Sequence, residues 1–146
     1  MPSTSKLRMK KLRITITVLI ALITLQGLLG NAINLFAIFP SGQVNGYFGF
    51  FQAVASVGPE LIIHMLNGFL ILALAIAVLA MSFTWNGSKE TKIASIIGLF
   101  AVVSAIAGGI LFVLSGFLDN SFSAQMGGSF IFAYLAYFAA LYYAKE

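Results

Sequence analysis

The one histidine of the chain, His64, lies in the stretch GPELIIHMLNG, inside a long apolar run. A neutral imidazole is the commonest metal ligand among side chains, and haem iron accepts histidine alone or paired with methionine. Met126, beside Gln125, is the methionine that would complete such a pair. Gly68 follows His64 by one helical turn and would leave room for a flat ring against the backbone. These residue types predict haem iron ligation by His64.

Two other roles of His64 stay open on the sequence alone. A histidine inside a membrane can hydrogen-bond an asparagine or glutamine of a neighbouring helix and hold the two helices together. Glu60 precedes His64 by four residues, so the two side chains share a helix face and would suit a proton relay or a quinone site. Glu60 would equally serve as a first-turn acid that complements the helix dipole.

Three side-chain amides lie in the second half of the first apolar run. Gln26, Gly30 and Asn34 share one helix face at i, i+4 and i+8, and Asn31 lies on the neighbouring stripe. Polar groups are costly in the hydrocarbon of a bilayer and tend to pair across helices. We therefore expect interhelical hydrogen bonds from Gln26, Asn31 and Asn34.

Four apolar runs must position these residues, and each is long enough to cross a bilayer, which takes about 20 helical residues. They are 14–39, 59–83, 93–118 and 122–143, in a chain of 146 residues of which only 8% are charged. We predict an all-α fold with one domain, in which a basic tail (1–13) precedes an antiparallel bundle of four transmembrane helices. The outer loop, 40–58, is apolar and aromatic, and we expect it at the membrane interface or folded back over the mouth of the bundle.

Counting about 1.5 Å per residue from the predicted helix ends places several of the polar residues at one depth. Asn34, His64, Gln125 and Met126 fall about 7 Å inside the outer end of the bundle, whereas Gln26 lies deeper, near the midplane. This layer draws on three helices, and it is where the sequence predicts a cofactor.

Every basic residue falls on one side of the bilayer if the chain crosses it four times. The eight are Lys6, Arg8, Lys10, Lys11, Arg13, Lys89, Lys92 and Lys145. The opposite side carries only Glu60 and Asp119, so the positive-inside rule predicts cytoplasmic N and C termini in a multi-pass protein of the plasma membrane. The net charge of +4 suits contact with anionic lipid headgroups and gives no reason to expect a nucleic acid partner. The chain has no cysteine, which excludes disulfides and thiolate metal sites.

Small residues recur along the run 93–118 at spacings of three or four. They are Ala94, Gly98, Ala101, Ala105 and Gly109. In lipid such a stripe allows helices to approach closely. We expect it to pack against another helix or to dock a second membrane subunit.

Three segments together resemble a known family. LQGLLGNAINLF, HMLNGFLILALAIAVLAM and AQMGGSFIFAYLAYFAALYYAK are similar to segments of uncharacterised small four-helix prokaryotic membrane proteins, whose layout is similar to one half of a heme A synthase. The resemblance implies histidines near the outer ends of the second and fourth helices, and it makes His64 the ligand on the second. This chain has Gln125 and Met126 in place of the other histidine. His–Met ligation, single-His ligation, a ligand from another subunit and a site without haem all stay open.

These observations lead to functions of different classes. The first is a small haem b-binding electron-transfer protein or accessory subunit of a respiratory redox complex, with His64, Met126, Gly68 and Gln125 at the site. The second is a cofactor-free structural subunit of a larger membrane complex, with other membrane subunits or further copies of the chain as partners in the lipid bilayer. A third is a quinone-contacting or proton-relaying subunit that uses Glu60 and His64. The sequence contains no HExxH, phosphate-binding glycine loop or Ser/His/Asp set, so an enzyme is not expected.

Overall fold

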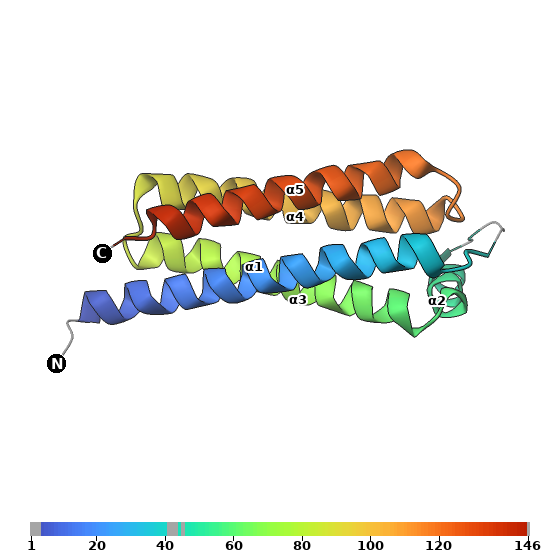
Figure 1. Ribbon diagram of the computed structural model, residues 1–146, viewed down its shortest axis with the longest axis horizontal. Helices are drawn as coiled ribbons and strands as arrows, with labels where there is room; N and C mark the ends of the chain where they lie inside the picture. Colours follow the sequence, from blue (N-terminus) through green and yellow to red (C-terminus); the bar gives the residue numbers. More distant parts are fainter. Residues whose placement is uncertain (1–3, 41–43, 45, 146) are drawn as a thin grey trace.

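The computed structural model describes residues 4–40, 44 and 46–145 and folds them into five α-helices (Figure 1). They are α1 (Thr4–Phe36), α2 (Gly46–Val57), α3 (Pro59–Thr84), α4 (Lys89–Leu114) and α5 (Asn120–Tyr143). All except α2 are long and apolar enough to cross a membrane. The prediction of an all-α fold with four long apolar helices is confirmed.

Helix α1 is longer than the apolar run that it contains. It begins at Thr4, because residues 4–13 are rich in good helix formers and contain no glycine or proline. The prediction of a tail is therefore wrong for these ten residues, and residues 1–3 lie outside the described residues. The helix ends at Phe36 rather than at residue 39, because Pro40 disfavours helical backbone ahead of it.

A proline or a capping side chain marks the first turn of each of the other three long helices. Pro59 occupies the beginning of α3, where its missing N–H removes no intrahelical hydrogen bond. Ser88 caps α4 by accepting the backbone N–H of Thr91 at 3.1 Å. The Asp119 carboxylate caps α5 in the same way, by accepting the backbone N–H of Ser121 at 2.9 Å. Because the turns before α4 and α5 are short, each of these helices runs antiparallel to the one before it.

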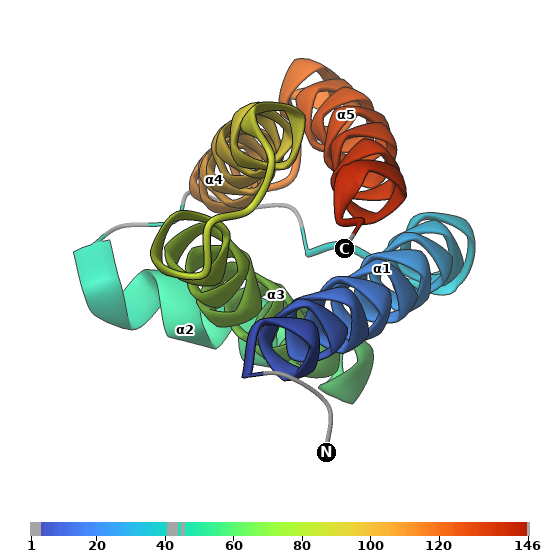
Figure 2. The same cartoon turned by 90° about the vertical axis from the view of Figure 1, so that its left-hand side faces the viewer.

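The four long helices form a ring in the order α1, α3, α4, α5, with α1 diagonally opposite α4 and α3 diagonally opposite α5 (Figure 2). Both termini and the α3–α4 turn lie at one end, which we call the basic end because all eight lysines and arginines are there (Figure 1). The other end holds α2 and the α4–α5 turn, and we call it the α2 end. At the basic end, Arg13 Nη1 donates to the carbonyl oxygen of Ala144 at 3.1 Å.

Helix α2 forms within the segment predicted to be an outer loop. The loop prediction is wrong for residues 46–57, and residues 41–43 and 45 lie outside the described residues. Helix α2 is seen end-on in Figure 1 and lengthwise in Figure 2, so its axis runs across the axis of the bundle. It contacts α3 and α4 and buries Val54 in a small core with Phe112 and Phe117.

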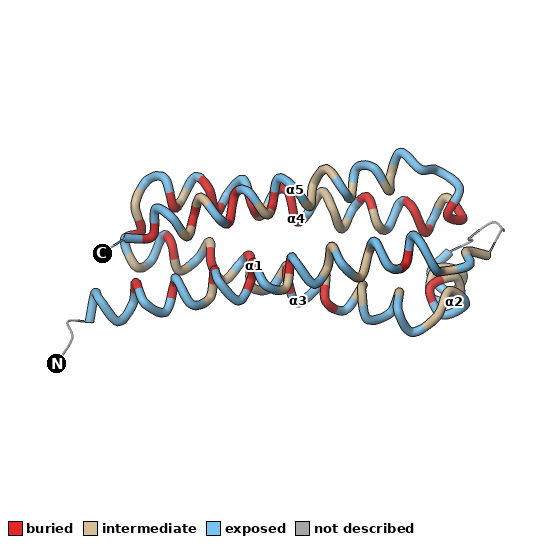
Figure 3. Tube along the Cα trace, viewed as in Figure 1, coloured by how far each residue is buried: buried red, intermediate tan, exposed pale blue. Residues whose placement is uncertain are grey.

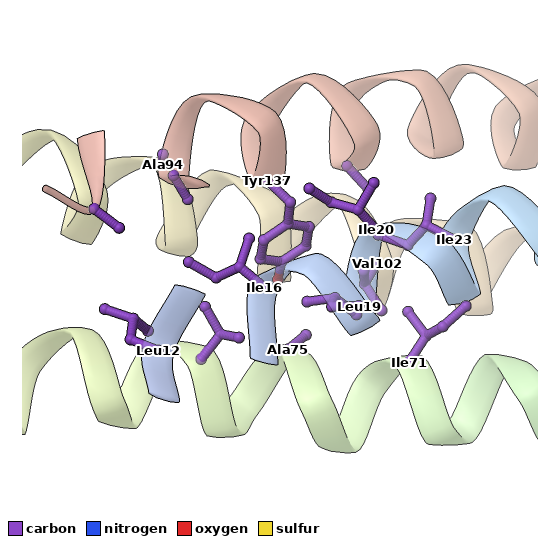
Figure 4. Packing of buried hydrophobic residues seen from close by; sticks show 14 of the residues in the cluster. Leu12, Ile16, Leu19, Ile20, Ile23, Ile71, Ala75, Ala94, Val102 and Tyr137 are labelled. Carbon is purple, nitrogen blue, oxygen red and sulfur yellow. The ribbon is translucent and has the colours of Figure 1, made fainter. Parts of the chain in front are cut away.

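The main core extends from the basic end through the middle of the bundle. Tyr137 of α5 is fully buried there, in one cluster with Ile16 of α1, Ala75 of α3 and Val102 of α4 (Figure 4). All four long helices therefore contribute to a single apolar core.

The outer surface of the bundle is apolar as well. Buried residues follow the inward stripe of each long helix and leave the outward stripes exposed (Figure 3). Those outward stripes carry large apolar side chains, including Phe100 at 72% and Phe132 at 66% exposure. Such a surface is poorly suited to water and suits the hydrocarbon of a bilayer.

Candidate functional site

Three polar side chains meet between α1 and α3. Gln26 Nε2 lies 3.1 Å from His64 Nε2 and donates to the His64 carbonyl oxygen at 3.1 Å. Asn67 Nδ2 donates to Gln26 Oε1 at 2.8 Å and to the Leu22 carbonyl oxygen at 3.2 Å. We call Gln26, His64 and Asn67 the polar clasp, because each of these bonds joins α1 to α3.

Two glycines make room for the polar clasp. A Cβ on Gly30 of α1 would lie 3.2 Å from His64 Cε1, and a Cβ on Gly68 of α3 would lie 3.4 Å from Gln26 Nε2. Each helix thus presents a glycine to the polar side chain of the other, which lets the backbones approach closely. The space over Gly68 was expected to hold a flat ring, and the Gln26 amide occupies it.

The polar clasp determines the tautomer of His64. A carbonyl oxygen only accepts hydrogen bonds, so the carbonyls of Leu22 and His64 identify the NH₂ ends of Asn67 and Gln26. The remaining N–H of Gln26 points to His64 Nε2, which must accept and therefore carries no proton. The proton of the neutral imidazole is then on Nδ1, which is buried without a hydrogen-bond partner.

The arrangement of the polar clasp does not fit haem as it stands. Histidine binds a metal through an unprotonated ring nitrogen, and the lone pair of Nε2 already accepts the Gln26 N–H. Nδ1 carries the proton. Iron ligation through Nε2 would require Gln26 to leave both His64 and the face of Gly68. Haem b binding stays a prediction, and it would require the polar clasp to open.

Gln125 and Met126 lie in a different interface, between α4 and α5. Gln125 Nε2 donates to the carbonyl and hydroxyl oxygens of Ser104 at 3.3 Å each. Met126 lies over Gly109 of α4, where a Cβ would be 3.2 Å from its Sδ atom. His64 contacts α1 and Met126 contacts α4, so the two residues of the expected ligand pair face different helices.

The remaining polar residues named from the sequence lie on the surface. Asn31, Asn34 and Glu60 are exposed. The Glu60 carboxylate lies beside Gly58 in the first turn of α3, which is the position of a first-turn acid. Asn34 was expected at the depth of His64, but the α1 residue beside the imidazole is Gly30, one turn deeper.

Asn67 is the member of the polar clasp that sequence reasoning missed. It follows His64 by three residues and therefore shares its helix face. It is also buried, with 9% of its surface exposed. The signal in the sequence was the amide itself, three residues after the one histidine inside an apolar run.

Comparison with known proteins finds no counterpart of this chain. No protein-family model matches it, and neither does any curated protein or solved structure. The resemblance to one half of a heme A synthase stays a prediction, and the interpretation of the polar clasp rests on its own geometry.

Proposed function

We propose that this chain is a multi-pass protein of the plasma membrane that serves as a cofactor-free structural subunit of a larger membrane complex. The observation that carries the proposal is the polar clasp. It uses the single imidazole of the chain to join α1 to α3. The polar groups of the clasp hydrogen-bond each other and hold two helices together, so they are not available as reactive groups. Such a bundle would contribute a scaffold and a contact surface to a complex.

The dimensions of α1 support insertion of the basic end into the headgroup region. The helix has 33 residues and is about 50 Å long, about 20 Å longer than the hydrocarbon core of a bilayer. The surplus length carries the five basic residues between residues 6 and 13. The gathering of lysine and arginine at this end supports cytoplasmic N and C termini.

Single cysteines test the topology, because the natural chain contains none. Thr84→Cys at the basic end and Asn120→Cys at the α2 end both replace exposed residues. In intact cells a membrane-impermeant maleimide should label Asn120→Cys and leave Thr84→Cys unlabelled until the cells are lysed. The opposite labelling pattern would reverse the proposed orientation, and labelling of both in intact cells would contradict a span between them.

A visible spectrum of the purified protein, reduced minus oxidised, decides between the structural subunit and the haem hypothesis. We expect a colourless preparation that unfolds cooperatively and co-purifies with partner subunits in mild detergent. A Soret band and an α band that disappear in His64→Ala would instead establish haem binding.

Gln26→Leu separates the two hypotheses a second time. If the polar clasp is structural, this variant loses stability and stays colourless. If His64 binds haem, the variant frees Nε2 and keeps the spectrum. Asn34→Leu is the matched control, because Asn34 is an exposed amide of the same helix face.

A further inference from the structure

Helix α2 presents one face to the bundle. This face packs on the small core at the α2 end, and its residues are Phe50, Ala53, Val54 and Val57. At 3.6 residues per turn they cover about one third of the helix circumference. The other two thirds point away from the bundle and differ from each other in chemistry.

One of the two outward faces is aromatic and the other is polar. Tyr47 is 88% exposed, Phe48 87% and Phe51 57%, and the three residues lie on one side of the helix. Ser56 is exposed on the remaining side, and Gln52, four residues after Phe48, is exposed at the border between the two outward faces. Helix α2 therefore has three faces, which contact protein, present aromatic rings and present polar groups.

The orientation of α2 matches this division into faces. Its axis runs across the bundle axis, and the end that begins at Gly46 projects beyond the outline of the bundle on the side of α3 and α4 (Figure 2). If the four long helices cross a bilayer, a helix placed in this way at their end lies parallel to the membrane surface. One outward face can then meet lipid while the other meets water.

We propose that α2 is an interfacial helix whose aromatic face, Tyr47, Phe48 and Phe51, inserts among the lipids of the membrane surface at the α2 end. The proposal rests on the membrane insertion proposed above. Aromatic side chains favour the membrane–water interface, and helices with separate apolar and polar faces lie in its plane. Helix α2 contains no charged residue, so its contact depends on the rings and would be insensitive to the headgroup charge.

The inferred contact gives the bundle an anchor at each end. The basic end is held by lysines and arginines in the headgroup region. The α2 end carries no lysine or arginine, and α2 supplies the anchor there by aromatic insertion. Together the two ends would fix the depth of the bundle in the bilayer.

Single-tryptophan fluorescence in nanodiscs tests the proposal. In a Trp85→Phe background, Phe48→Trp and Phe51→Trp report on the aromatic face, Ser56→Trp reports on the polar face, and Phe100→Trp reports on the exposed middle of α4. The discs contain phosphatidylcholine brominated at a shallow or a deep position of the acyl chain, and iodide serves as the aqueous quencher. Circular dichroism checks that each variant keeps its helix content.

We expect shallow brominated lipid to quench Phe48→Trp and Phe51→Trp at least twofold, with blue-shifted emission and little effect of iodide. Ser56→Trp should show the reverse pattern. Equal quenching of Phe51→Trp and Ser56→Trp by iodide would overturn the proposal. Protection of Phe48→Trp from both quenchers would overturn it as well, because a second copy or another protein would then cover α2. Failure of deep brominated lipid to quench Phe100→Trp would overturn membrane insertion itself, so the two proposals fail in distinguishable ways.

Discussion

The helix pairs α4–α5 and α1–α3 combine close packing and hydrogen bonds in different proportions. Helices α4 and α5 pack by shape, since Tyr137 lies over Gly98, where a Cβ would be 2.7 Å from Tyr137 Cζ. Helices α1 and α3 are joined by the hydrogen bonds of the polar clasp. Apolar side chains gain little by leaving lipid for another helix, so close packing and interhelical hydrogen bonds drive association in a bilayer. Both pairs use both interactions, because Gln125 and Ser129 of α5 donate to Ser104 of α4, and glycines bring α1 and α3 together. The closer packing of the two pairs nevertheless lies between α4 and α5, at Gly98.

Each pair leaves one buried polar atom without a hydrogen-bond partner. In the α4–α5 pair it is the Tyr137 hydroxyl, and in the α1–α3 pair it is His64 Nδ1. In the polar clasp, both amide groups use both of their N–H donors. We therefore expect steric changes to act mainly on α4–α5 and polar changes mainly on α1–α3.

Gly98→Leu should have the largest effect. The new side chain would overlap the ring of Tyr137, which is fully buried, and overpacking of this kind costs about 3 kcal/mol. Thermal unfolding in mild detergent measures the loss. Gly127→Leu is the matched control, because nothing lies within 4 Å of a Cβ there. Equal destabilisation by both variants would contradict shape-based packing of α4 on α5.

Gln26→Leu should destabilise the protein by about 1–2 kcal/mol, because interhelical hydrogen bonds in membranes contribute on that scale. The change leaves His64 Nε2 without its donor and Asn67 without its acceptor. Unfolding in detergent gives the loss. ¹⁵N NMR of the imidazole gives the tautomer, which should be protonated on Nδ1 in the natural chain and shift toward a mixture in the variant. Protonation of Nε2 in the natural chain would show that the hydrogen bonds of the polar clasp have other donors and acceptors.

Tyr137→Phe should raise stability by about 1 kcal/mol, because it removes a buried hydroxyl that has no hydrogen-bond partner. The ring that fills the space over Gly98 is kept. Tyr142→Phe serves as the control, since Tyr142 is 63% exposed and its hydroxyl can be hydrated. A loss of stability in Tyr137→Phe would show that the hydroxyl has a partner in the membrane, such as a bound water.

The smallest effect concerns the turn that joins α4 to α5. Hydrogen bonds from the Ser121 hydroxyl and backbone N–H lower the pKa of Asp119 below its ordinary value of 3.8. A carboxylate with a lowered pKa contributes stability above its unfolded-state pKa and loses that contribution as the pH falls through the folded-state pKa. The melting temperature of the natural chain relative to Asp119→Asn should thus be constant from about pH 7 to about pH 5 and fall below about pH 4. An unchanged difference down to about pH 2 would contradict this cap.

The long helices were predictable from hydropathy, and the run 59–83 matches α3 to within one residue, but the ends of α1 and α4 differ from the runs 14–39 and 93–118. A run of about 20 apolar residues is visible in any sequence, whereas α1 ends at Phe36 instead of residue 39 because of backbone preferences near Pro40. Three residues are almost one helical turn. Because depth was counted from residue 39 instead of Phe36, Asn34 was expected beside His64. In the structure Gly30 lies beside His64.

The hydropathy pattern predicted neither which helices are neighbours in the bundle nor the presence of α2. Helices that are apolar on all sides do not indicate which helix lies beside which, so nothing in the sequence marked α3 and α5 as diagonally opposite. The glycines at positions 46 and 49 favoured a loop in the segment that forms α2. Helix α2 exists because Val54 and its neighbours bury against Phe112 and Phe117, and this contact depends on tertiary structure.

The hydrogen bond from Arg13 to the Ala144 carbonyl joins residues 131 positions apart, almost the full length of the chain. A ribosome releases the start of a protein long before its end. Helices α1 and α3 can close the polar clasp once Asn67 has been made, but the ring of helices can close at the basic end only after residue 144 has emerged. Helix α1, made first, therefore joins α5 at the basic end only after α5 has been made.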